Sequence, residues 1–242
     1  MKIRSIFKNA VLILLTVFAA VSCNDYEEEL EVLTDVYVIN KKFGNEVRSA
    51  NAYYAYASES MLKVTVSMTG IAGVVELESY SGATFTMAKE PKDADYKTEA
   101  PLDGSYVFNI QGYNGEMLQV PDILSYEGID IPEFTKTKFS GTPLILELEW
   151  NDVDGADGYV VKMFDTGGKL IFNGYSVGTD VNKYTITSSS NSGFWSSPAV
   201  EGQSYLLQLS AFSYDADANA SNAVYNISEI SIGEIQIMWG AN

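Results

Sequence analysis

The chain has 242 residues, of which 15 are Lys or Arg and 32 are Asp or Glu, so its formal net charge at pH 7 is −17. A chain this acidic repels phosphate backbones, which argues against binding to nucleic acid. It contains no histidine and one cysteine, which removes the commonest general base, the Ser–His nucleophile pair and most zinc sites. We therefore expect no catalytic residues, no metal ion and no cofactor. Glycoside cleavage by two carboxylates is the catalytic alternative that remains.

Residues 1–22 have the build of a secretory signal peptide. Three cations and no acid precede an apolar run at residues 10–21. A run of about a dozen residues is shorter than the roughly 20 that a membrane-spanning helix needs. A buried N-terminal helix is the alternative, but Thr16 is the only residue in the run that could supply its polar face.

The end of this run contains the only cysteine. Residues Ala20-Val21-Ser22-Cys23 resemble the lipobox of bacterial lipoproteins, in which leucine usually stands where this chain has Ala20. The resemblance implies that residues 1–22 are removed and that Cys23 is lipidated, which leaves a net charge of about −20. Several acyl chains on one residue are enough for stable attachment to a membrane. An ordinary signal sequence with a stray thiol is the alternative, although oxidising compartments pair cysteines.

Residues 23–31 are acidic, and like charges predict an extended, solvated tether. The segment also resembles the acidic run that follows the lipidated cysteine in surface-exposed lipoproteins of the Bacteroidota, where it signals export to the outer face. The resemblance implies a lipid-anchored protein of the outer membrane, exposed at the cell surface. A lipoprotein of the inner leaflet is the alternative.

Residues 32–135 predict a first β-sandwich of the immunoglobulin-like type. Its predicted strands are Val36–Ile39, Tyr53–Ala57, Met61–Met68, Val74–Tyr80, Ala83–Met87 and Gly104–Gly112. Tyr106 resembles a tyrosine corner, in which the phenol near the start of a strand bonds back to the backbone. Tyr54 and Tyr56 share a strand face, and we favour packing over a binding role for them. A linker is predicted near Ile131–Lys136.

Residues 136–242 predict a second sandwich. Its predicted strands are Pro143–Trp150, Tyr159–Phe164, Lys183–Thr187, Gly202–Phe212 and Ala223–Ile237, the last with a break at Gly233. Trp150, the turn Gly155-Ala156-Asp157-Gly158-Tyr159 and the strand containing Tyr205 resemble a fibronectin type III domain. The resemblance implies that Trp150 is a core residue and that Tyr205 forms a tyrosine corner. The predicted fold is thus all-β, with two tandem antiparallel β-sandwiches after a lipoprotein signal peptide.

Three segments could bind a ligand. Asp152–Asp157 is rich in carboxylates, but it lacks the spacing and the later glutamate of a calcium-binding EF-hand loop, so we interpret it as a turn. Phe194 and Trp195 lie in a polar loop and could stack on sugar rings or peptide side chains, or could instead close one end of the sandwich. Tyr214 begins the loop that variable immunoglobulin domains use for contacts.

These features predict a non-catalytic surface lipoprotein. Its resemblance to accessory lipoproteins of starch-utilisation-type (Sus-type) uptake systems implies a TonB-dependent transporter and its SusD-like lipoprotein as partners, and a glycan or peptide as ligand. A structural or adhesive spacer is the alternative. Exposed aromatic side chains gathered on one face would favour binding, and polar surfaces throughout would favour a spacer.

Overall fold

The computed structural model describes residues 30–187, 192–216, 218 and 226–241. Chain contacts divide the protein into residues 1–31 and residues 32–242, and the fold described below is that of the second unit. Cys23 lies outside the described residues. Apart from one 3-10 turn at Asp93–Asp95, the regular elements are β-strands, and no helix in the described part is long and apolar enough to cross a membrane.

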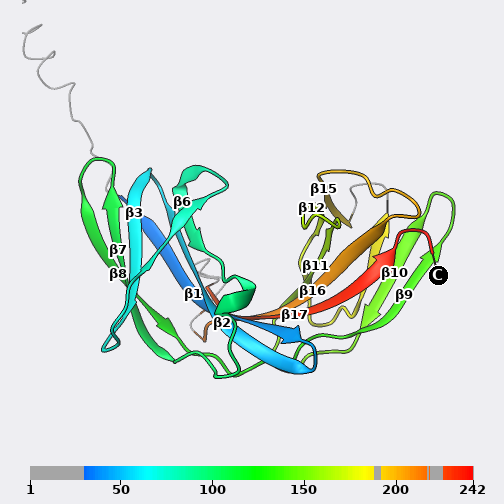
Figure 1. Ribbon diagram of the computed structural model, residues 1–242, viewed down its shortest axis with the longest axis horizontal. Helices are drawn as coiled ribbons and strands as arrows, with labels where there is room; N and C mark the ends of the chain where they lie inside the picture. The colour runs from blue at the N-terminus through cyan, green and yellow to red at the C-terminus, as the bar shows by residue number, and fades with distance from the viewer. Residues whose placement is uncertain (1–29, 188–191, 217, 219–225, 242) are drawn as a thin grey trace, which may run out of the picture. The chain divides into compact units, whose positions relative to one another are not determined.

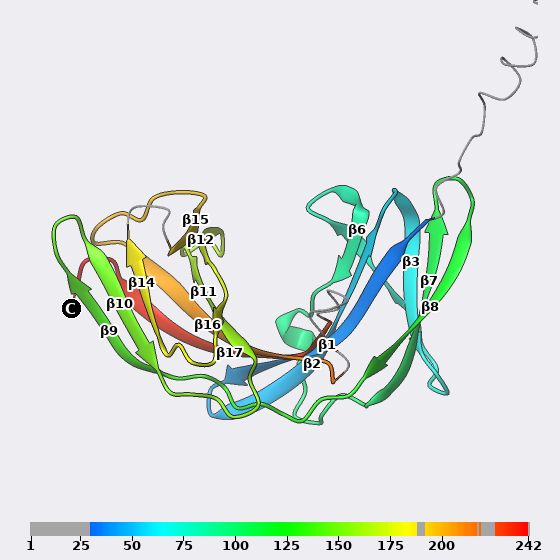
Figure 2. The same cartoon turned by 180° about the vertical axis from the view of Figure 1, so that it is seen from behind.

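The first half forms an immunoglobulin-like sandwich (Figures 1 and 2). Its strands are β1 (Val32–Phe43), β2 (Glu46–Ala57), β3 (Met61–Met68), β4 (Val75–Glu76), β5 (Glu78–Tyr80), β6 (Ala83–Lys89), β7 (Gly104–Gly112) and β8 (Met117–Leu124). One layer has the order β1-β2-β6-β5 and the other β4-β3-β7-β8. This is the A-B-E-D and C-F-G arrangement of an immunoglobulin domain, with β4 added beside strand C.

The second half forms a fibronectin-like sandwich. Its strands are β9 (Phe134–Ser140), β10 (Ile145–Trp150), β11 (Gly158–Phe164), β12 (Leu170–Gly174), β13 (Val177–Gly178), β14 (Lys183–Thr187), β15 (Gly193–Trp195), β16 (Ser204–Tyr214) and β17 (Ile227–Met238). Strands β14-β10-β9 form one layer, and β15-β12-β11-β16-β17 belong to the other. The prediction of two sandwiches is confirmed by this strand order.

One sheet belongs to both halves. Strand β17 pairs in parallel with β1, with Val38 opposite Glu229 and Lys41 opposite Ile232, and Figure 1 shows the two strands running side by side. The pairing joins two layers into a single ten-stranded sheet. Because this sheet passes from one half to the other, it does not mark a boundary between them. The predicted domain boundary between residues 135 and 136 therefore remains a prediction.

Both predicted tyrosine corners are present. The Tyr106 hydroxyl donates to the Leu102 carbonyl at 3.1 Å, and the Tyr205 hydroxyl accepts from the Val200 backbone N–H at 2.8 Å. Each bond ties the start of a central strand, β7 or β16, to the loop that leads into it. The presence of a tyrosine corner in each half supports the assignment of both halves as immunoglobulin-like sandwiches.

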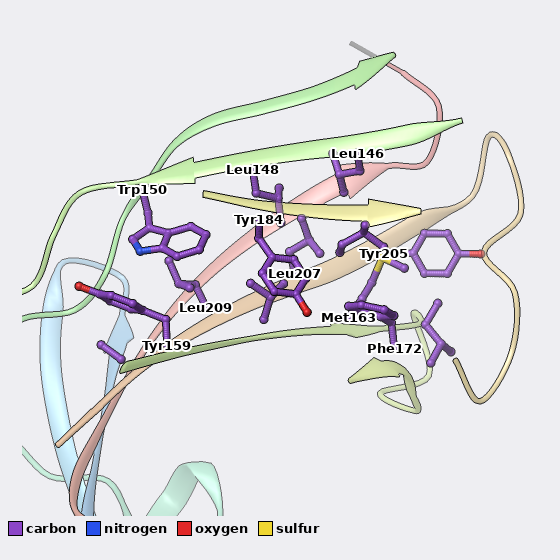
Figure 3. Close-up of a cluster of buried hydrophobic side chains, with 14 of the residues drawn as sticks. Leu146, Leu148, Trp150, Tyr159, Met163, Phe172, Tyr184, Tyr205, Leu207 and Leu209 are labelled. Carbon is purple, nitrogen blue, oxygen red and sulfur yellow. The ribbon is translucent and has the colours of Figure 1, made fainter. Parts of the chain in front are cut away.

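The core of the second sandwich lies between its two layers, as Figure 3 shows. Trp150 from β10 packs against Tyr159 from β11, with ring centroids 5.4 Å apart. Alternating residues of β16, among them Leu207 and Leu209, are fully buried against them. The predicted core position of Trp150 is therefore confirmed.

Two strand predictions are wrong in detail. Strand β17 runs unbroken through Gly233, which stays in register with Leu209. The glycine is needed because the linker backbone lies against it, so that an added Cβ would stand 1.9 Å from the Pro132 carbonyl oxygen. The predicted strand Val74–Tyr80 is also divided, since the chain leaves one sheet at β4 and enters the other at β5, with Leu77 buried between them.

We expect Gly233→Ala to lower the free energy of unfolding by about 1–3 kcal/mol, because the methyl group forces the linker off the sheet. Urea denaturation would measure the change. Gly178→Ala is the matched control, since Gly178 is an exposed strand residue whose nearest neighbour is the movable Asp180 carboxylate. Equal stabilities for the two variants would contradict this account of Gly233.

Candidate functional site

The main candidate site is a groove of about 700 Å³ over the shared sheet. We call it the sheet groove. Its floor is formed by outward-facing residues of β11, β16, β17 and β1, and its walls by β5, the β6–β7 loop and β12. The lining residues are Tyr37, Ile39, Lys41, Tyr80, Glu90, Pro91, Asp93, Tyr96, Val160, Lys162, Phe164, Leu170, Ser176, Gln208, Ser210, Phe212, Tyr214, Ile227, Ile230 and Ile232.

Strand register places apolar residues in rows across the floor. Phe212 is opposite Ile230 on β17, and Ile230 is opposite Ile39 on β1. Gly158 on β11 faces Phe212, and an added Cβ there would stand 2.7 Å from the Phe212 ring. The missing side chain of Gly158 therefore leaves the space that the phenyl ring occupies.

The β6–β7 loop covers one side of the floor. Tyr96 from this loop is buried beside Ile39 in a small hydrophobic cluster and packs on the Phe43 ring at 5.2 Å. The 3-10 turn places Asp93 in the groove wall, next to Glu90. The wall thus offers carboxylates above an apolar floor.

Charges and phenols give the groove its polar groups. Lys41 on β1 forms an ion pair with Glu234 on β17, with N and O 3.2 Å apart. Burial is the main cause that raises the pKa of Tyr37, and it raises the pKa of Tyr96 to about 12, with help from the Asp93 carboxylate. Both phenols therefore remain protonated near neutral pH.

A buried carboxylate holds the linker beneath the shared sheet. Glu229 is fully buried, and its Oε2 accepts from the backbone N–H groups of Gly128 and Ile129, each at 3.0 Å. The Asn40 side-chain amide donates to Glu229 Oε1, and it also donates to the Ser231 hydroxyl at 3.1 Å. Burial raises the pKa of Glu229, and these hydrogen bonds oppose the rise. The network satisfies a polar group that would otherwise be costly to bury.

Two further carboxylates lie where β1 and β17 separate. Asp35 Oδ2 accepts from the Ile227 N–H at 3.1 Å, and Asp122 Oδ2 accepts from the Val36 N–H at 2.8 Å. These side chains supply acceptors to strand N–H groups beyond the end of the parallel ladder. The other Asp35 oxygen is buried without a hydrogen-bond partner among the described residues. Burial, followed by the nearby charges of Asp122 and Asp215, raises the pKa of Asp35 to about 8.

The predicted aromatic pair lies outside the sheet groove. Phe194 on edge strand β15 is 64% exposed and packs on Tyr175 at 5.2 Å. Trp195 is half-buried, donates its indole N–H to the Thr187 carbonyl at 3.0 Å and packs at a tilt against Phe172, with ring centroids 4.8 Å apart. Trp195 also lines an apolar pocket of about 240 Å³ at the end of the sandwich. A binding role for Phe194 and Trp195 remains a prediction.

The structure brings Tyr214 into the sheet groove, where its ring packs on Phe212 at 5.3 Å. Its backbone N–H donates to Asp157 Oδ2 at 2.8 Å. Asp157 belongs to the carboxylate-rich turn between β10 and β11, in which the Val153 N–H donates to the Tyr159 hydroxyl at 2.8 Å. The interpretation of Asp152–Asp157 as a turn is confirmed.

Sequence reasoning missed most of the groove. Its floor is formed by strand residues such as Ile230 and Ile232, which lie on the face of β17 that is turned away from the core. Apolar residues on both faces of the Ile227–Ile237 stretch were the available signal. That signal indicated that something covers the second face, but the partner strand lies some 190 residues away in the chain.

We expect stability to depend on pH through Asp35. In the folded protein the carboxyl stays protonated up to about pH 8, whereas in the unfolded chain it ionises near pH 4. Its contribution is therefore fully present below pH 4 and is lost as the pH rises through 8. Asp35→Asn keeps an oxygen acceptor for the Ile227 N–H and removes the charge. Urea denaturation at pH 5, 7 and 9 should show the variant gaining stability over the wild type as the pH rises, and a constant difference would contradict this.

No protein-family model and no curated protein sequence matches the chain. Similar solved structures include Tp47, the 47-kilodalton lipoprotein of Treponema pallidum, at 9% identity and a TM-score of 0.35 over 86% of this chain and 50% of that chain. A two-domain fibronectin type III segment of chicken tenascin matches at 12% identity and a TM-score of 0.24, over 86% and 98% of the chains. A tetra-tandem repeat from the extending region of a large adhesion protein matches at 15% identity and a TM-score of 0.22, over 84% of this chain and 49% of that chain. The chain spans about half the length of the Treponema lipoprotein. All three TM-scores are below 0.5, so the fold assignment rests on the strand order.

Proposed function

We propose that this protein is a non-catalytic, lipid-anchored binding protein of the outer cell surface, and that the sheet groove holds its ligand. The single observation that carries the proposal is the groove itself. It has a volume of about 700 Å³, an apolar floor that also holds the half-buried Tyr37, and a wall with carboxylates and the buried Tyr96. Ligand sites in proteins commonly combine such a volume and an apolar lining with a few polar groups.

A glycan or a peptide chain is the proposed class of ligand. Both present flat or apolar faces that can pack on rings such as Phe212 and Tyr214, and polar edges that can bond to phenols and carboxylates. The negative charge of the chain disfavours anionic ligands. A neutral or cationic chain therefore fits the groove best.

The N-terminal sequence supports the location that we propose. Residues Ala20-Val21-Ser22-Cys23 resemble a lipobox, and the acidic segment after Cys23 resembles that of surface lipoproteins of the Bacteroidota. We propose that the protein is an accessory subunit, in the outer membrane, of a Sus-type complex that contains a TonB-dependent transporter and a SusD-like lipoprotein.

A structural or adhesive spacer is the second candidate function. The observation that favours it is the shared sheet, because the β1–β17 pairing adds an ordered connection between the two sandwiches. A spacer needs no ligand. Binding measurements on the groove therefore distinguish the two candidates.

The groove is tested by screening the purified protein against soluble polysaccharides and peptides, followed by calorimetry on any ligand found. We expect Phe212→Ala to weaken binding about 2- to 10-fold, since an aromatic contact contributes about 0.5–1.5 kcal/mol beyond its buried area. Phe194→Ala is the control, because Phe194 is an exposed aromatic residue outside the groove. A loss of binding only in Phe194→Ala would instead place the site at the β12–β15 edge. Thermal unfolding of both variants would show whether the fold is retained.

The anchor is tested by expressing the full chain with its signal sequence. The wild type should fractionate with outer membranes and enter the detergent phase on phase separation, because acyl chains on Cys23 hold it there. Cys23→Ser should be released into the aqueous phase. Co-purification of a TonB-dependent transporter in stoichiometric amount with the wild type would support the uptake role, and recovery of the protein alone would count against it.

A further inference from the structure

Among the described residues of the first sandwich, a smaller group of exposed apolar side chains that includes Leu102 and Ile123 lies at one end, and the larger group lies at the other. Strands β1, β3, β6 and β8 begin at this end, and β2 and β7 finish there. Each of the six strands places a large, exposed apolar residue near its terminus. These residues, which we call the end patch, are Leu33, Tyr56, Leu62, Phe85, Tyr113 and Met117, with exposed fractions from 43% to 70%.

The end patch is held by contacts between its loops. The Tyr113 N–H donates to the Ser60 carbonyl at 3.3 Å, and the Ser60 hydroxyl lies 2.9 Å from the Thr84 hydroxyl. The Tyr56 and Phe85 rings meet edge to face at 6.1 Å. A shallow hollow of about 520 Å³ lies among these rings and loops. The Tyr56 and Phe85 rings, which pack on each other, therefore lose little further freedom when a surface covers them.

The chain enters the fold at the same end. Val32, the first residue of β1, pairs with Ala57, the last residue of β2, and the next pair is Leu33 with Tyr56. Nine peptide steps separate Cys23 from Val32, which limits the distance between them to about 30 Å at full extension. If Cys23 is acylated, the end patch must therefore lie within about that distance of the membrane, plus the depth of the anchor.

We propose that the end patch rests on the lipid surface in which the acyl chains of Cys23 are embedded. The proposal rests on the proposed lipidation. Tyr, like Trp, is enriched at membrane–water interfaces, because its ring is apolar and its hydroxyl can remain hydrated, and Phe is common on the apolar face of elements that lie in the interface. Leu33 and Met117 add apolar surface that is exposed in the structure.

Charge indicates the kind of lipid. Glu59 and Glu116 lie beside the patch, and Glu31 is the last residue before β1. Carboxylates are repelled by anionic headgroups within a Debye length. The contact should therefore form on zwitterionic phospholipid and weaken as anionic lipid is added.

The absence of any other cysteine permits a direct test. With Cys23 acylated, the mature chain has no free thiol, so Tyr113→Cys and Leu102→Cys each carry one site for an environment-sensitive fluorophore. Leu102 is the matched control, since it is 58% exposed and lies at the opposite end of the same sandwich, before β7. Each labelled, lipidated protein is reconstituted into phosphatidylcholine vesicles that contain a lipid-borne quencher.

We expect quenching of the label at residue 113 to be at least about threefold greater than at residue 102, and to fall when anionic lipid is added. Equal quenching at the two positions in protein that is membrane-bound would overturn the proposal. In native membranes, protection of residue 113 from both lipid-borne and aqueous quenchers would also overturn it, because a protein partner would then cover the patch. Failure of the protein to partition into vesicles at all would contradict the lipid anchor itself, and that outcome is read separately from the quenching.

Discussion

The parallel pairing of β1 with β17 is the interaction on which the rest of the structure depends. It joins the A strand of the first sandwich to the G strand of the second, so that two layers become one sheet of ten strands. Without it Ile39 and Ile230 would lie on separate edges, and the floor of the sheet groove would be divided. The pairing also removes two exposed strand edges, which otherwise invite pairing with other chains.

Carboxylates in the junction make this pairing specific. Glu229 binds the linker from below through two backbone N–H groups, while Asp35 and Asp122 bond to strand N–H groups where the ladder ends. Burying such groups costs free energy, and the raised pKa values of Asp35 and Glu229 are the electrostatic sign of that cost. Gly233 adds a steric condition, since only glycine leaves room for the Pro132 carbonyl. Together they allow one register of the linker against the sheet.

Local patterns predicted the sandwiches because the alternation of buried and exposed residues in a sandwich strand can be recognised within a few residues. Alternation around Leu146, Leu148 and Trp150, and tyrosines at 106 and 205, were sufficient to predict both halves. The shared sheet could not be predicted in this way, since its partners are separated by about 190 residues. The groove could not be predicted for the same reason, because its floor is continuous only where β1 and β17 pair. Tyr214 was proposed from its loop position and lines the groove, whereas Phe212 and Ile230 lie in strands and carried no such signal; a binding role for Tyr214 remains a prediction.

Strand β1 connects the proposed anchor, the end patch and the groove. Its first residues pair with the end of β2 beside Tyr56, its middle residues Tyr37 and Ile39 line the groove, and its alternate residues Val36 and Val38 are buried on its other face. A force transmitted through the proposed anchor would act along a strand that is hydrogen-bonded to β2 over twelve residues and to β17 near its far end. Sliding such a strand requires many ladder bonds to break together. The arrangement would allow the groove to keep its shape in a protein held by the proposed anchor.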